Sequence, residues 1–253
     1  MAELREILRY LTELLTPADF EDASFNGLQV ESPSQDIRKV ATAVDSGLSI
    51  IERATAAKSQ LLIVHHGLLW GGVMPIAGTY GKKVNLLLSS GCSLYASHLP
   101  LDAHRVVGNN ALLAQHFELT LEGGFAEANG KFIGVLARTK SLLTREHFTQ
   151  QARQLTGCTD ALMLPFGPEK ISTVGILSGS GAFAIHAAAA QGIDLLISGE
   201  PKQQVYHEAK ELGVNALFAG HYATETLGVR ALGRLLHERF GIEHLFIDEP
   251  TGI

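Results

Sequence analysis

Residues 37–66 read IRKVATAVDSGLSIIERATAAKSQLLIVHH, and residues 171–200 read ISTVGILSGSGAFAIHAAAAQGIDLLISGE. Aligned without a gap, the two segments are identical at ten of thirty positions. Each has an apolar run, a Ser-Gly pair, a helical stretch and a second apolar run that ends in polar residues. This order predicts a strand–helix–strand unit with parallel strands. The shared hydrophobic pattern raises the identity by itself, but the matched Ser-Gly pairs at 46–47 and 180–181 favour an internal duplication.

The segments that follow also resemble each other. Residues 96–102 read ASHLPLD, and residues 219–225 read AGHYATE. Each ends an apolar strand with small residues and a histidine, and each places a carboxylate four residues later. In open α/β sheets, ligands bind at the carboxyl ends of the strands. We therefore expect an α/β fold of two similar halves, residues 1–125 and 126–253, with polar side chains from both halves forming one site.

Apolar runs predict the strands of this fold, and apolar positions at helical spacing predict the helices that cover the sheets. A first amphipathic helix is expected over residues 4–15, ended by Pro17. The predicted strands are 40–44, 61–64, 93–96, 132–136, 174–177, 195–197, 216–219 and 244–247. The further predicted helices are 48–57, 144–156, 183–191, 203–212 and 224–240.

The composition excludes several classes of protein. The chain has 253 residues, of which 46% are hydrophobic and 18% charged, with a net charge of −6. Such a chain can bury a core, and its apolar runs are too short for a membrane span. Residues 1–15 lack the apolar region of a signal peptide, and Cys92 and Cys158 are too few for a disulfide scaffold or a thiolate zinc site. We expect a cytoplasmic protein that binds neither membranes nor, given its acidity, nucleic acid directly.

Three clusters of metal-ligating residue types follow predicted strands. Imidazole and carboxylate together suit Zn, Fe, Mn, Co or Ni. A single histidine at a strand end is usually a surface or hydrogen-bonded residue, and a His–Glu pair four residues apart is often an ordinary helix pair. Three clusters at one sheet edge favour a metal site instead. The clusters are His65-His66, His98 with Asp102 and His104, and His221 with Glu225.

The spacing within these clusters bears on the number of ions. His221 and Glu225 lie four residues apart on one helix face, so they could reach one ion or straddle two. Adjacent strand residues such as His65 and His66 point in different directions, which is awkward for one ion and suits two.

Two weaker candidates remain. Glu200 occupies the repeat position of His66, so it is a candidate base or supporting carboxylate, or else an exposed loop acid before Pro201. The glycine-rich segment 175–181 resembles a phosphate loop but lacks the spacing of the nucleotide-binding motifs. A tight strand-to-helix turn explains that segment better.

These motifs resemble those of the NIF-three-like dinuclear metal-centre family, whose members are also named homologues of GTP cyclohydrolase 1 type 2. The resemblance runs in order along most of the chain. It rests on NGLQV at 26–30, IVHHG at 63–67, HLPLDAH followed by GNN at 98–110, SGE at 198–200, and GH followed by a glutamate at 220–225.

The resemblance implies a metal centre and an assembly. It implies two divalent ions, Fe, Zn or Mn, held by His65, His66, Asp102, His221 and Glu225, with Glu225 bridging them. It places His98 beside the ions or the substrate. His98 and, from its position in the repeat, Glu200 are the candidate catalytic residues. It also implies two interlocked halves with the metal site between them, and a ring-shaped homohexamer.

The function expected from this centre is hydrolysis. Two metal ions about 3.5 Å apart lower the pKa of a bound water and supply a nucleophile near neutral pH. We expect a metal-dependent hydrolase of the GTP cyclohydrolase 1 type 2 homologue class, acting on a cyclic amidine or a small nucleotide-like substrate. The alternative is a non-catalytic metal-carrying or regulatory protein, or an interaction protein linked to DNA repair or transcription. An open coordination position with a bound water would favour the hydrolase.

Overall fold

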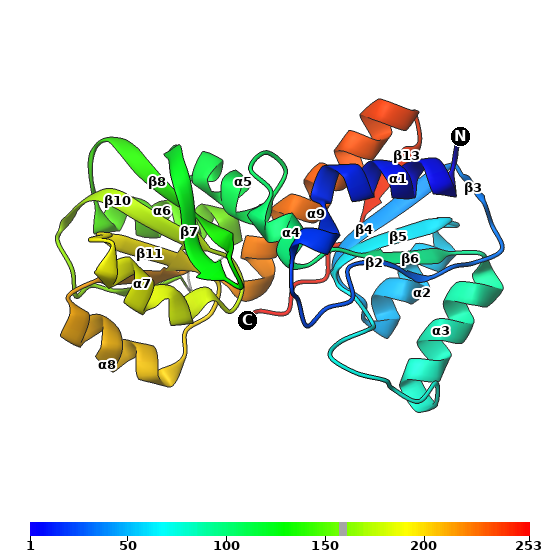
Figure 1. The fold of residues 1–253 in the computed structure, drawn as a ribbon, viewed down its shortest axis with the longest axis horizontal. Helices are drawn as coiled ribbons and strands as arrows, with labels where there is room; N and C mark the ends of the chain where they lie inside the picture. Colours follow the sequence, from blue (N-terminus) through cyan, green and yellow to red (C-terminus); the bar gives the residue numbers. More distant parts are fainter. Residues whose placement is uncertain (157–160) are drawn as a thin grey trace. The chain divides into compact units, whose positions relative to one another are not determined.

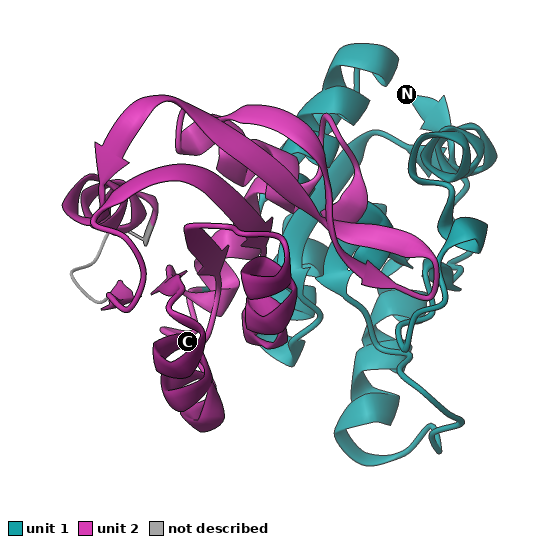
Figure 2. Ribbon diagram, turned by 60° about the vertical axis from the view of Figure 1, so that its left-hand side comes forward, with its two compact units in different colours: residues 1–101, 228–249 teal, residues 102–227, 250–253 magenta. Residues whose placement is uncertain are grey.

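The structure, a computed structural model, describes residues 1–156 and 161–253. It forms two compact units, coloured separately in Figure 2. Unit 1 comprises residues 1–101 and 228–249, and unit 2 comprises residues 102–227 and 250–253. This division differs from the expected one at residue 125, because residues 102–125 belong to unit 2 and a C-terminal segment returns to unit 1.

Unit 1 contains a five-stranded sheet (Figure 1). Four strands are parallel, and the strand at one edge is antiparallel to its neighbour. The C-terminal strand pairs with the strand that begins the first repeat, which explains why the chain returns to this unit. The strand order is β13 (Glu243–Phe246), β4 (Lys39–Asp45), β5 (Leu61–His66), β6 (Ser93–Ala96) and β2 (Gly27–Val30).

Helices cover both faces of this sheet, so its central strands are almost continuously buried. In Figure 1, α2 (Leu48–Ala56) and α3 (Gly78–Ser90) lie on one face and α1 (Leu4–Leu15) on the other. Apolar positions of α1 recur at helical spacing, and the side chains of Leu4, Ile7, Leu11 and Leu15 are buried. The unit also contains the pair β1 (Ala2–Glu3) and β3 (Asp36–Ile37), the short helix η1 (Pro17–Asp19), most of α4 (Leu99–Ala103) and residues 228–240 of α9 (His221–Phe240).

Unit 2 contains a six-stranded sheet with a parallel centre. Strands β10, β11 and β12 are parallel, and the strands that flank them are antiparallel. Both sheets therefore set an antiparallel edge strand beside a run of parallel strands, four in unit 1 and three in unit 2. The order is β7 (Thr120–Ala128), β8 (Lys131–Thr144), β10 (Lys170–Leu177), β11 (Leu195–Ser198), β12 (Asn215–Phe218) and β9 (Leu162–Leu164).

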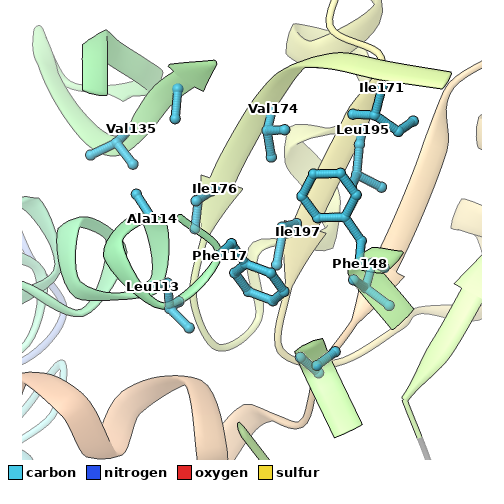
Figure 3. Close-up of a cluster of buried hydrophobic side chains, with 14 residues drawn as sticks. Leu113, Ala114, Phe117, Val135, Phe148, Ile171, Val174, Ile176, Leu195 and Ile197 are labelled. Carbon is cyan, nitrogen blue, oxygen red and sulfur yellow. The ribbon is translucent and has the colours of Figure 1, made fainter. Parts of the chain in front are cut away.

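The core of unit 2 lies between this sheet and two helices (Figure 3). Phe117 follows α5 (Asn109–His116), and Phe148 lies on α6 (Arg145–Thr156); their ring centroids are 6.0 Å apart. Fully burying a large apolar side chain contributes about 1.5–3 kcal/mol, so these residues anchor both helices to the sheet. The unit also contains η2 (Gly181–Ala184), α7 (Ile185–Ala190) and α8 (Gln203–Leu212), and α9 (His221–Phe240) begins in it.

The predicted strands and helices are all present: 4–15, 93–96 and 203–212 keep their predicted bounds, the other ends shift, and the predicted helix 183–191 begins as a 3-10 helix. Strand β5 extends through both His65 and His66, two residues beyond the predicted end. Helix α9 begins at His221, three residues before the predicted start. Within the described residues, no helix combines the length and the apolarity that a membrane span requires.

Candidate metal centre

The two adjacent histidines of unit 1 end strand β5, and each is fixed through the same ring atom. The Nδ1 atom of His65 bonds to the backbone oxygen of Ser97 at 2.9 Å, and the His65 side chain is fully buried. The Nδ1 atom of His66 bonds to Asp45 Oδ1 at 2.8 Å. Asp45 ends the neighbouring parallel strand in register with His66, so the sheet itself sets this pair.

A third histidine, His98, is fixed in the same way by a buried aspartate. Its Nδ1 atom lies 2.9 Å and 3.1 Å from the two carboxylate oxygens of Asp22. Burial raises the pKa of Asp22, but the hydrogen bond and charge of His98 and the bond from Asn26 outweigh it, and the pKa falls to about 2. Asn26 also accepts a bond from the backbone N–H of His98 at 2.7 Å.

These three histidines form a donor set suited to a metal ion. One ring nitrogen from each of His65, His66 and His98 lies within 4.8 Å of the others. Carbonyl and carboxylate oxygens accept hydrogen bonds, so Nδ1 carries the proton in each ring and the lone pair lies on Nε2. Metal-binding histidines typically have this arrangement, with the second nitrogen bound to a carboxylate or carbonyl. The residues present therefore fit a metal ion.

The donor set of unit 2 lies at the start of α9. His221 Nε2 is 3.2 Å from Glu225 Oε1, and His221 Nδ1 is 3.4 Å from Glu200 Oε1. The side chain of Glu225 is only 3% exposed. Burial lowers the pKa of His221, but the hydrogen bonds and charges of Glu225 and Glu200 outweigh it and raise the pKa to about 9. The predicted placement of both residues on one helix face is thus found.

Gly179 lies directly against the two donors of unit 2, His221 and Glu225. Its φ is +59°, and a Cβ atom there would overlap Glu225 Oε1 and lie 3.1 Å from His221 Nε2. Its N–H donates to Thr224 Oγ1 at 3.1 Å, within the first turn of α9. The glycine-rich segment is therefore a strand-to-helix turn, as predicted, and its glycine leaves room for the two donors.

Asp102 is held in unit 2 by two side chains. Its Oδ1 atom accepts bonds from Asn109 Nδ2 at 2.8 Å and from Ser178 Oγ at 3.0 Å. Asn110 donates to the backbone oxygen of Asp102 and accepts from the backbone N–H of Ser178. The two asparagines of the sequence motif thus orient a carboxylate that is 5% exposed.

The other candidates divide between supporting and structural roles. Ser180 bonds to Glu200 and, with His221, lowers the pKa of that carboxylate, so Glu200 belongs to the unit 2 set. The Nδ1 atom of His104 accepts the backbone N–H bonds of Val106 and Val107, both at 3.1 Å, so it stabilises its own loop. Burial raises the pKa of Cys92 to about 12, which removes it as a thiolate, and Cys158 lies outside the described residues.

Asp22 and Asp45 were missed by the sequence reasoning. Asp45 could have been found, because it ends a predicted strand beside the one that carries the histidines. Asp22 lies in irregular chain 76 residues before His98, and its sequence offers no signal for the pairing.

Comparison with known proteins identifies the family of this chain. The model of the family described as Duf34/NIF3 (NGG1p interacting factor 3) matches residues 2–252. The chain belongs to the Duf34/NIF3 family. A relative from Archaeoglobus fulgidus, named GTP cyclohydrolase 1 type 2 homolog, is 40% identical over 250 residues and covers 99% of both chains.

Two solved structures share the whole fold of this Duf34/NIF3 protein. The protein ybgI, described as of unknown function, matches with a TM-score of 0.92 and 32% identity over 100% of both chains. The protein TTHA1606 from Thermus thermophilus matches with a TM-score of 0.88 and 39% identity, also over 100% of both chains. The family resemblance predicted from the motifs is therefore confirmed, as is the α/β fold with helices flanking the sheets.

Proposed function

We propose that this Duf34/NIF3 protein binds two divalent ions through His65, His66, Asp102, His221 and Glu225 and hydrolyses a small substrate with them. The observation that carries the proposal is the anchoring of His65, His66 and His98 through Nδ1, to a carbonyl or carboxylate oxygen. Such anchors orient the ring and raise the basicity of Nε2 toward a metal.

The assignment of His65 and His66 to different ions rests on the alternation of side chains along a strand and on the family resemblance. Their ring planes are tilted by 50°, and one ring is held from β6's end while the other is held from β4. In unit 2, Glu225 has a buried carboxylate with two oxygens, and it would be the bridging ligand, as the family resemblance implies. That the ligands of both units serve one centre is inferred from the motifs and the family.

Five side chains leave coordination positions open, and two bound ions would lower the pKa of a water there and supply a nucleophile near neutral pH. Residues of the protein hold protons at defined atoms and orient the histidine rings. Asp22 keeps the proton of His98 on Nδ1, so that His98 Nε2 is the atom suited to accept a proton or to hold the substrate. Glu200 faces Nδ1 of His221 and orients that ring.

The proposed substrate class is a cyclic amidine or a small nucleotide. The relative from Archaeoglobus fulgidus bears the name GTP cyclohydrolase 1 type 2 homolog, and water attack on a heterocyclic C–N bond is the reaction that fits that name. A ring-shaped homohexamer in the cytoplasm is proposed as the setting, as the family resemblance implies.

Metal analysis of natively purified protein, combined with a hydrolase screen using the metal found, tests this proposal. We expect two ions per chain in the wild type and the loss of at least one in Glu225→Gln, because a neutral amide bridges cations poorly. Glu238→Gln, an exposed position on the same helix, is the matched control and should keep both ions. A single fully occupied ion bound by both His65 and His66 after soaking in excess Zn or Mn would refute the dinuclear centre. Two exchangeable ions without turnover of any nucleotide would favour the metal-carrying alternative.

A further inference from the structure

Two of the clustered histidines, His66 and His98, lie against the chain's single tryptophan, Trp70. The ring centroid of Trp70 is 5.0 Å from that of His98 and 5.8 Å from that of His66. Trp70 is 36% exposed, which is a large solvent-facing area for an indole next to a polar cluster. The metal centre proposed above gives this residue no role.

The indole is held in place by its own loop. Its Nε1–H donates to the backbone oxygen of Gly67 at 2.9 Å, so the one polar atom of the ring is satisfied within the protein. Trp70 forms an antiparallel bridge with Ser24, and the backbone N–H of Gly71 donates to Ala23 at 2.8 Å. The tryptophan is thus fixed before any ligand arrives.

Gln29, from the NGLQV motif, fastens this loop to the rest of unit 1. Its Oε1 atom accepts the backbone N–H bonds of Leu68 at 2.6 Å and Leu69 at 3.2 Å, and its Nε2 atom donates to Phe25 at 2.7 Å. A Cβ atom on Gly67 would overlap the amide of Gln29. The motif and the glycine after the two histidines therefore serve to place the loop that carries Trp70.

We propose that the indole of Trp70 is a stacking wall for a planar nitrogen heterocycle of nucleobase size, held beside His66 and His98. The inference rests on the proposed function for its substrate class. With its N–H already bonded, the exposed part of the ring offers π surface and no hydrogen bond, which suits stacking on a flat ring. Stacking on an aromatic side chain tolerates different bases, so Trp70 selects a flat ring rather than one particular base.

The test uses the full-length, metal-loaded protein with guanosine as the planar probe and ribose as the non-planar control. Fluorescence of the wild type reports on Trp70 alone, since the chain has one tryptophan. Calorimetry then gives the dissociation constant of guanosine for Trp70→Leu, Trp70→Phe and Val73→Ala. Val73 is fully exposed in the same loop and is the matched control.

We expect guanosine, but not ribose, to change the fluorescence of the wild type. Trp70→Leu should weaken guanosine binding about tenfold or more, while Trp70→Phe and Val73→Ala retain most of the affinity. Equal affinity in Trp70→Leu and the wild type, or no guanosine binding by the wild type, would overturn the inference. If Trp70→Leu does not fold, the fluorescence titration and the Trp70→Phe variant decide. Metal content is measured on the same samples. Absence of bound metal refutes the proposed function. Metal content equal to that of the wild type, together with unchanged guanosine affinity in Trp70→Leu, refutes only the stacking role of Trp70.

Discussion

Gly179 lies so close to Glu225 that a Cβ atom at residue 179 would overlap the carboxylate oxygen Oε1. The same Cβ would lie 3.1 Å from His221 Nε2. The turn after β10 thus determines whether the two donors of unit 2 keep their positions. In the internal repeat, the aligned residue is Asp45, which anchors His66 in unit 1. Of these two aligned residues, Asp45 anchors His66, whereas Gly179 leaves space for His221 and Glu225.

Gly179→Ala should lower metal binding while the fold is retained. The new methyl group would displace Glu225 or His221, so we expect at least one ion to be lost from the purified protein. Gly192→Ala is the matched control, because Gly192 also has a positive φ, +64°, but nothing lies within 4 Å of its Cβ position. Both variants carry the cost of a left-handed alanine, about 1–2 kcal/mol. Metal analysis and circular dichroism check the prediction, and equal metal content in the two variants would contradict it.

Asp45→Ala should weaken metal binding about 10–100-fold without altering the sheet, because the anchor of His66 Nδ1 is lost. The carboxylate is at the end of β4 and contributes no side chain to either apolar core. Asp36→Ala, an exposed position on β3, is the control and should bind metal as the wild type does. Competition with a chromophoric chelator measures the affinity. An unchanged affinity in Asp45→Ala would mean that the ring of His66 needs no anchor.

Local pattern was enough to predict some parts of this site and not others. The histidines at 65 and 66 follow an apolar run, and His221 and Glu225 are one helical turn apart, so both pairs could be read from the sequence. The partners that orient them come from distant segments: Asp22 bonds to a residue 76 positions away, and Ser178 to Asp102 at the same separation. Such pairings depend on the tertiary fold, for which spacing along the chain carries no signal.

The division of the chain into two units also could not be predicted from local sequence pattern. A repeat predicts two consecutive halves, but β13 pairs with the edge of the first sheet. Which strand pairs with a sheet edge is decided by the tertiary fold, since that sets which strand lies beside the edge. His244 on β13 bonds to Thr42 on β4 at 2.9 Å, across 202 residues of sequence. Only the three-dimensional fold reveals this return of the chain.

Asp22→Asn should destabilise the protein in a pH-dependent manner. The pKa of Asp22 in the folded protein is about 2, below its ordinary value of 3.8, so the ionised carboxylate stabilises the fold above about pH 4. That contribution is lost as the pH falls through 2. We expect a difference in unfolding free energy between wild type and variant of about 1–2 kcal/mol at neutral pH, narrowing below pH 4. Urea denaturation from pH 7 to pH 2 measures it, and a difference that stays constant or widens on acidification would show that the pair with His98 does not stabilise the charge.

Asp102→Asn separates the charge of this carboxylate from its hydrogen bonds. Asp102 Oδ1 accepts from Asn109 and Ser178, and the amide oxygen of an asparagine can accept the same two bonds. The variant should therefore unfold within about 1 kcal/mol of the wild type, whereas Asp102→Ala leaves two buried donors unsatisfied and should cost about 1–3 kcal/mol. Metal content should fall in both variants, because neither offers an anionic oxygen to a cation. Thermal unfolding and metal analysis of the two proteins, side by side, check this. If Asp102→Asn kept the full metal content, Asp102 would be a structural acceptor for Asn109 and Ser178 and not a ligand.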